Sequence, residues 1–340
     1  MSAIHIYSPC KILEEIAERQ EKDPIVQKVQ KIDIPGLKFG YNPSIVSVEE
    51  RNYLFFRYDV ENIYEGYGNR KIKSFTACAV FDSKMETLLE VKEIALDSFF
   101  AEDARAIYFQ GHIYLFYNKP LGTPLDAKFR LERRMCVAKL DPESFEVLDQ
   151  QIMQFDLFPV EKNWIPFVMK EPSGKEGIFL IHHLKNFRIL RLDLTNLSVV
   201  YPYFIETTPL KPVIDWGALW GPARGGTPAI QVDDEFVMFF HSCYVPKGHG
   251  IDIRYYVMGA LVFEAAPPFK LKKMSTEPLV FDEMYASTFR RSNQFTVYPA
   301  GVCYDPKKEE FLVSVGENDR AMKIVHIDKN ALYRQLLDIL

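Results

Sequence analysis

The sequence lacks paired cysteines. Its 340 residues contain five cysteines, none of them in a CxxC pair. An odd number of scattered cysteines favours reduced thiols over a disulfide framework. We therefore expect a cytoplasmic protein. The five positions are Cys10, Cys78, Cys136, Cys243 and Cys303.

Long apolar runs and an excess of one charge are also missing. No stretch approaches the ~18 uninterrupted apolar residues of a membrane-spanning helix, and the opening MSAIHIYSPCKILEEIAERQ has acids early and no apolar signal core. We expect neither a membrane span nor a secretory signal. The net charge of −5 comes from interspersed acids and bases, so no broad basic surface for nucleic acid is expected.

The common cofactor motifs are absent too. The sequence has no GxGxxG, P-loop, HExxH or GxSxG pattern. His182 and His183 are adjacent in an expected strand, so their side chains point to opposite faces and make a poor metal pair. We therefore expect neither a metal nor a bound cofactor.

The sequence is rich in short apolar runs. Hydrophobic residues make up 48% and aromatic residues 14% of the chain, enough for a large core. From Asn42 onward, β-branched and aromatic runs alternate with turn signals such as Gln110-Gly111-His112. These runs form groups of about four, beginning near residues 45, 104, 165, 227 and 300. This repetition predicts an all-β fold, a five-bladed β-propeller over residues 41–328. Two packed β domains remain the alternative, because the repeats share no residue motif.

The two ends of the chain have a helical pattern. Residues 1–40 are expected to form a helical extension, with Ile12, Ile16, Ile25 and Val29 at roughly helical spacing and Pro24 as an interruption. Residues 329–340 are expected to form a helix with one apolar face. Such termini are natural contacts for a homo-oligomer. The apolar residues of the second helix are Leu332, Leu336, Leu337 and Leu340.

Polar residues precede the first apolar run of each expected blade. In a propeller, the entry loops of the innermost strands meet at one mouth of the central channel. The sequence therefore predicts a polar funnel. The entries are Asn42-Pro43-Ser44, Glu102-Asp103-Ala104-Arg105, Glu161-Lys162-Asn163-Trp164, Arg224-Gly225-Gly226-Thr227-Pro228 and Tyr298-Pro299-Ala300-Gly301.

These entries, with Phe-His-Ser at 240–242, Tyr-x-Met-Gly-Ala at 256–260 and Gly-Glu-Asn-Asp at 316–319, resemble glycoside hydrolase family 130 over residues 40–328. That family contains five-bladed β-mannoside phosphorylases and hydrolases. The related glycosyltransferase family 108, with β-1,2-mannosyltransferases and phosphorylases, shares the fold. The resemblance implies an enzyme that acts on β-mannosides.

The resemblance places the family's proton donor at Asp103. The usual segment is Glu-Asp-Pro-Arg, and Ala104 stands here in place of the proline. A carboxyl group beside Glu102 at a partly desolvated channel mouth is expected to have a raised pKa, as a general acid requires. The alternative is an ion pair of Asp103 with Arg105 that caps the strand.

The resemblance also implies a set of phosphate-binding residues. Arginine is usual where Lys162 and His183 stand, and lysine where Arg224 stands. Both side chains suit phosphate oxygens. Lys162 as a solvated loop lysine and His241 as a structural histidine remain alternatives, and the choice of His183 over His182 rests on strand parity. The implied set is Lys162, Asn163, His183, Arg224, His241 and Tyr256.

Substrate contacts are implied for a second set of residues. Trp164, Trp216 and Trp220 are either sugar platforms or core residues, and Asp319 is either a ligand or an ordinary turn aspartate. The implied substrate-binding set is Asn42, Ser44, Arg57, Glu102, Arg105, Trp164 and Asp319.

The expected reaction is inverting phosphorolysis of a β-mannoside, or its reverse, with α-mannose 1-phosphate as product and inorganic phosphate as co-substrate. A phosphorylase needs no second carboxylate, because phosphate is already a nucleophile, whereas an inverting hydrolase needs one to activate water. The alternatives are a GDP-mannose-dependent β-mannosyltransferase, a β-mannoside hydrolase and a non-catalytic glycan-binding propeller.

Overall fold

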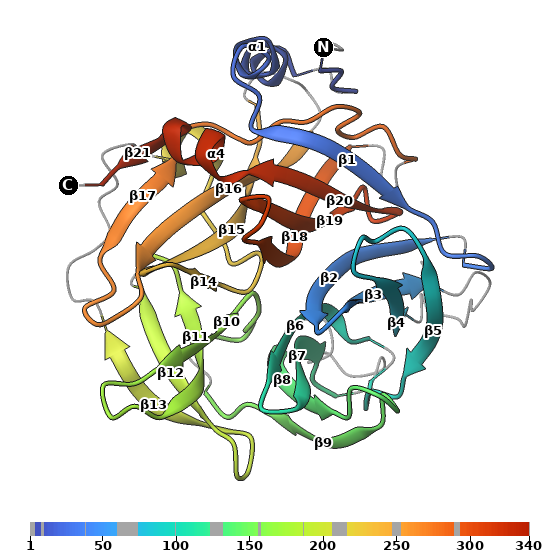
Figure 1. Cartoon of the computed structure of the whole chain (residues 1–340), viewed down its shortest axis with the longest axis vertical. Coiled ribbons are helices and arrows are strands. Elements are labelled where there is room, and N and C mark those ends of the chain that lie inside the picture. Colours follow the sequence, from blue (N-terminus) through green and yellow to red (C-terminus); the bar gives the residue numbers. More distant parts are fainter. Residues whose placement is uncertain are drawn as a thin grey trace.

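The computed structural model describes residues 4–7, 10–37, 39–59, 74–98, 100–122, 132–155, 158–185, 187–205, 216–246, 253–288 and 293–339. Strands dominate this part of the chain, which confirms the expected all-β class (Figure 1). The helices among the described residues are short: α1 (Lys11–Gln20), α3 (Trp216–Trp220) and α4 (Lys329–Gln335).

Three sheets have four antiparallel strands each, in sequence order. The first contains β2 (Gly40–Val48), β3 (Arg51–Asp59), β4 (Ser74–Asp82) and β5 (Leu88–Ile94). The second contains β6 (Glu102–Phe109), β7 (His112–Pro120), β8 (Arg133–Leu140) and β9 (Val147–Ile152). The third contains β10 (Ile165–Lys170), β11 (Glu176–His183), β12 (Arg188–Asp193) and β13 (Ser198–Ile205).

The remaining strands form one nine-stranded sheet. Its first part is β14 (Ile230–Val232), β15 (Glu235–Tyr244), β16 (Arg254–Glu264) and β17 (Leu271–Ser275). Its second part is β18 (Gln294–Asp305), β19 (Glu310–Glu317) and β20 (Ala321–Asp328). A short parallel pairing of β16 with β18 joins the two parts, so the last two expected four-strand units share one sheet.

The sheets follow one another around the middle of the view in Figure 1, and each group begins close to its expected position. The first strands start at Gly40, Glu102, Ile165, Ile230 and Gln294.

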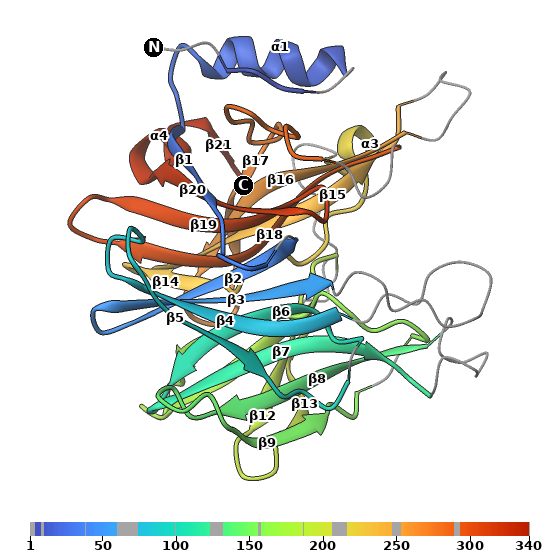
Figure 2. The ribbon, with the colours of Figure 1, turned by 90° about the vertical axis from the view of Figure 1, so that its right-hand side faces the viewer.

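The ends of the chain differ from the expectation. The helical extension predicted for residues 1–40 contains α1, which lies at one end of the molecule in both views (Figures 1 and 2), but Val26–Ile32 forms strand β1 on the edge of β20. The predicted terminal helix ends at Gln335, and Leu336–Asp338 forms β21 beside β17. In both places a free sheet edge offers the backbone partners that a short isolated helix cannot match. Leu340 lies outside the described residues.

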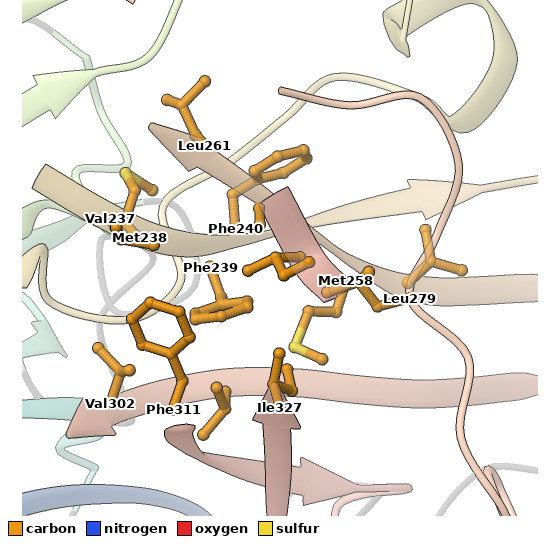
Figure 3. Close-up of a cluster of buried hydrophobic side chains, with 14 of the residues drawn as sticks. Val237, Met238, Phe239, Phe240, Met258, Leu261, Leu279, Val302, Phe311 and Ile327 are labelled. Carbon is orange, nitrogen blue, oxygen red and sulfur yellow. The ribbon is translucent and has the colours of Figure 1, made fainter. Parts of the chain in front are cut away.

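A large apolar core joins the two parts of the nine-stranded sheet. Phe239 of β15 and Met258 of β16 point toward Phe311 of β19 and Ile327 of β20, whereas Phe240 lies on the other face of β15 (Figure 3). The rings of Phe239 and Phe311 meet edge to face, with centroids 5.8 Å apart. This shared core fixes the relative position of the strand entries that carry the polar groups.

The first strands of the first two sheets open with a local irregularity. The register of β2 with β3 shifts between Tyr41 and Ser44, and that of β6 with β7 shifts between Glu102 and Arg105. Asn42 and Asp103, inside these shifts, both have left-handed backbones, with φ of 50° and 57°. A bulge of this kind re-aims the side chain it contains.

Phe311→Ala is expected to lower the free energy of unfolding by about 3–5 kcal/mol, because it removes a fully buried ring from the core shared by the two parts of the sheet. Urea unfolding measures the loss. The control Leu89→Ala, at a side chain that is 52% exposed, should change stability by about 0.5 kcal/mol or less. Equal losses for the two variants would contradict this description of the core.

Candidate active site

Asp103 lies at the opening of β6, half-buried, next to the first strand of the neighbouring sheet. Asn42 Nδ2 donates a hydrogen bond to Asp103 Oδ1 at 2.8 Å. The preceding residue, Glu102, forms ion pairs with Arg57 at 3.3 Å and Arg133 at 2.9 Å. Of the two adjacent carboxylates, Glu102 is thus neutralised by two arginines while Asp103 is held by a neutral amide.

The charges around Asp103 decide its protonation. Burial raises the pKa of Asp103, but the positive charges of Arg57, Arg105 and Lys162, together with the Asn42 hydrogen bond, outweigh burial and lower the pKa below its usual value. The raised pKa expected from desolvation is therefore wrong. Asp103 is a carboxylate at neutral pH.

Arg105 is fully buried at the centre of the strand entries. Its Nε donates to Gly226 O at 2.5 Å, and its Nη2 donates to Gly225 O at 2.9 Å. Nη2 also donates to Tyr298 Oη at 2.7 Å and to Asn163 Oδ1 at 3.3 Å.

The hydrogen bond between Arg105 and Asp103 joins Nη1 to the main-chain oxygen of Asp103, at 3.1 Å. The capping ion pair considered for these two residues is therefore not what the guanidinium makes. Arg105 instead connects the entries of β6, β10, β14 and β18.

A pocket of about 330 Å³ adjoins the hub, by which we mean Arg105 and its hydrogen-bond partners. Its lining includes Lys162 and Asn163 before β10, His183 at the end of β11 and Arg224 before β14. Lys162, His183 and Arg224 are exposed to solvent. The pocket therefore gathers four residues of the implied phosphate set, from segments far apart in the sequence, on a surface that an anion can reach.

The loop that carries Lys162 and Asn163 is fixed by Glu161. This buried carboxylate accepts hydrogen bonds from the main-chain N–H of Phe158 at 3.0 Å, from Trp164 Nε1 at 3.1 Å and from His182 Nε2 at 3.0 Å. His182 is therefore a buried partner of Glu161, whereas the adjacent His183 is exposed and lines the pocket. Burial lowers the pKa of His183, and the neighbouring His182 adds to this effect.

His241 and Tyr256 lie behind Arg224. The main chains of Arg224 and His241 exchange two hydrogen bonds, of 2.8 and 3.0 Å. The His241 ring stacks on Tyr256, with centroids 6.3 Å apart, and contacts Tyr298 at 4.7 Å. Burial, with repulsion from Arg105 and Arg224, lowers the pKa of His241 to about 3, so its imidazole is neutral at physiological pH.

The implied substrate residues have varied surroundings. Ser44 is buried, and its hydroxyl accepts a hydrogen bond from the Ala106 N–H at 2.9 Å, which joins the first two sheets. Trp164 belongs to a hydrophobic cluster and is fully buried. Asp319 has a left-handed backbone in the turn between β19 and β20. Their roles in substrate binding stay predictions.

Two residues of the site did not emerge as candidates from the sequence. Tyr298 is buried, accepts a hydrogen bond from Arg105 and donates to Asn163 Oδ1 at 3.0 Å. Glu161 fixes the Lys162 loop. Both stand in the strand-entry segments, which is the only sequence signal for them.

The described residues hold no cluster of three or more metal-ligating side chains. None of the helices in this part of the chain is long and apolar enough to cross a membrane.

His241→Asn is expected to make acid destabilisation shallower. The unfolded chain protonates this histidine below about pH 6.5, whereas the folded protein keeps it neutral down to about pH 3. Between these values the unfolded state binds one more proton, so the free energy of unfolding falls with decreasing pH by at most about 1.4 kcal/mol per unit.

Urea unfolding between about pH 4 and pH 6 measures the two slopes. The control His5→Asn, at an exposed side chain, should keep the parent slope. Parallel slopes for parent and His241→Asn would show that the buried imidazole is not held neutral.

Comparisons with known proteins agree with the fold and also show which family the chain belongs to. The family model described as beta-1,4-mannooligosaccharide phosphorylase, glycoside hydrolase family 130, matches residues 14–338. No curated protein matches the chain.

Solved structures share the fold. A mannose phosphorylase from Leishmania mexicana, in complex with phosphate ion, has a TM-score of 0.62 at 12% identity, covering 97% of this chain and 96% of its own. The β-1,2-mannobiose phosphorylase of Listeria innocua has a TM-score of 0.60 at 14% identity, covering 92% and 94%. A putative glycoside hydrolase from Parabacteroides distasonis has a TM-score of 0.58 at 15% identity, covering 86% and 87%. With the family model matched over nearly the whole chain, this protein belongs to glycoside hydrolase family 130.

Proposed function

We propose that the protein is an inverting β-mannoside phosphorylase. A phosphate oxygen attacks the anomeric carbon of a β-linked mannose, the bond to the leaving sugar breaks, and the leaving oxygen takes a proton. The products are α-mannose 1-phosphate and a sugar shortened by one residue. We also propose that the sheets form five blades of a propeller, with the nine-stranded sheet supplying two of them, since the chain belongs to family 130, which contains five-bladed propellers.

The observation that carries the proposal is the cationic pocket that contains Lys162, whose charge also acts on Asp103. Lys162 and Arg224 bring two exposed positive charges, and Asn163 and His183 add polar groups, within a volume of about 330 Å³. Lys162 lowers the pKa of both Asp103 and His241 electrostatically. A charge in the pocket therefore influences the protonation of the Asp103 carboxyl group. Phosphate needs only to be held and oriented in such a site.

The protonation of Asp103 fits a reaction that begins with phosphate binding. Before phosphate binds, the surrounding cations keep Asp103 ionised. A phosphate anion between Lys162 and Arg224 offsets part of that positive charge and so raises the pKa of the carboxyl group. Asp103 then takes up the proton that it delivers to the leaving oxygen, directly or through a sugar hydroxyl.

The carboxylates of the site favour phosphorolysis over hydrolysis. An inverting hydrolase needs a second carboxylate to activate water. Glu102 is paired with two arginines, and Glu161 is buried with three donors on its oxygens. Neither arrangement suits a general base, because fixed donors already occupy the carboxylate oxygens that would have to accept a proton from water.

The cysteines support a cytoplasmic location as part of the proposal. No disulfide bond joins any of the five, as expected for thiols in a reducing compartment.

Asp103→Asn is expected to lower kcat for phosphorolysis by about 10²- to 10⁴-fold, because the amide cannot deliver a proton. Release of mannose 1-phosphate from a β-mannobiose in phosphate buffer measures it. Mannobiose binding, followed by calorimetry, should change little. An active Asp103→Asn enzyme would exclude this carboxyl group as the acid, and a parent that shows binding without turnover would identify a glycan-binding protein.

Lys162→Met is expected to raise the KM for phosphate by roughly 10- to 100-fold, the cost of losing a charged hydrogen bond to the anion. Initial rates at varied phosphate concentration measure it. The control Lys175→Met removes an exposed lysine at the opposite end of the same sheet and should leave the KM unchanged. Mannose release at a rate independent of phosphate would identify a hydrolase, and turnover with GDP-mannose instead would identify a transferase.

A further inference from the structure

The orientation of the Asn163 amide is determined by two donors. Arg105 Nη2 and Tyr298 Oη both lie within hydrogen-bond distance of Asn163 Oδ1, at 3.3 and 3.0 Å. A guanidinium can only donate, and Tyr298 Oη already accepts from Arg105 at 2.7 Å, so its own proton is directed to Asn163. In the opposite orientation, the N–H groups of the amide would point at these two donors, and no hydrogen bond could form.

The backbone of Asn163 is fixed as well. Asn163 has a left-handed backbone, with φ of 64°. Its carbonyl oxygen packs against Gly225 so closely that a Cβ there would lie 1.9 Å away. Gly225 O in turn accepts a hydrogen bond from Arg105 Nη2 at 2.9 Å. Arg105 therefore braces both sides of this contact.

The amide nitrogen of Asn163 remains available for a ligand. Both acceptor sites of Oδ1 are used, and within the described part of the chain Nδ2 makes no hydrogen bond. Asn163 is half-buried and lines the pocket with Lys162 and Arg224. Its Nδ2 carries two N–H donors, which suit a phosphate oxygen.

We propose that Arg105 and Tyr298 are positioning residues that lock the Asn163 amide with its N–H donors toward a phosphate in the pocket. They make this side chain a fixed donor that cannot turn its oxygen toward the anion. Arg105 also places a buried positive charge behind the amide, without a carboxylate bonded to its guanidinium among the described residues. The inference rests on the proposed function, because the ligand it assigns is phosphate.

A double-mutant cycle tests the inference, with inorganic phosphate as the probe and calorimetry on the full chain as the measurement. Tyr298→Phe removes one of the two donors to Oδ1, and the expected loss of phosphate affinity is roughly three- to tenfold. In the Asn163→Ala background, Tyr298→Phe is expected to cause no further loss, because its effect acts through the asparagine. The thermal midpoint of each variant shows that it is folded.

The matched control is Tyr304→Phe, which removes a hydroxyl from the same strand, β18, next to Phe311 and should leave phosphate affinity unchanged. Equal losses from Tyr298→Phe in both backgrounds, or no loss in the parent, would overturn the positioning role and leave the proposed function intact. A folded parent that binds no phosphate would overturn both.

Discussion

The site depends on one buried guanidinium. Arg105 is fully buried, and its hydrogen-bond partners are main-chain oxygens, a tyrosine hydroxyl and an asparagine oxygen. A buried charge is costly unless its donors are satisfied, so the strand entries must meet at fixed positions to supply these acceptors. The hydrogen bonds that offset the free-energy cost of burying Arg105 therefore also hold the entries of β6, β10, β14 and β18 together. Gly225 and Gly226 permit this, since a Cβ at either position would collide with neighbouring main chain.

The positive charges around Arg105 also determine the protonation of Asp103. Desolvation alone would raise the pKa of Asp103, but Arg57, Arg105 and Lys162 surround it and their attraction prevails. Burial, with repulsion from Arg105, Arg224 and Lys162, lowers the pKa of His241 and keeps its imidazole neutral. A site that ionises its carboxylate and deprotonates its histidine is arranged for an anionic ligand, because such a ligand relieves the excess positive charge. The electrostatics thus link phosphate binding to the protonation of Asp103.

Local sequence patterns were sufficient for the strands but not for the ends of the chain. The five groups of strands begin where alternating apolar runs predicted them, since periodicity is a local property. Val26, Val29 and Ile32 are three residues apart, a spacing that fits a helix as well as a strand. The free edge of β20, about 300 residues away, decides for the strand, and no local pattern contains that information.

The site could be predicted in part for the same reason. The strand-entry segments, and the family resemblance that they carry, brought Asp103, Asn163, Lys162 and Arg224 into one hypothesis, and the structure places these residues around one hub and pocket.

The protonation of Asp103 was predicted with the wrong sign, because the balance between desolvation and three cations depends on distances that only the fold determines. Tyr298 was missed as a candidate because its importance comes entirely from two partners, at positions 105 and 163, that are remote in the chain. Residue type shows which groups can react, and the fold determines which of them are held fixed to do so.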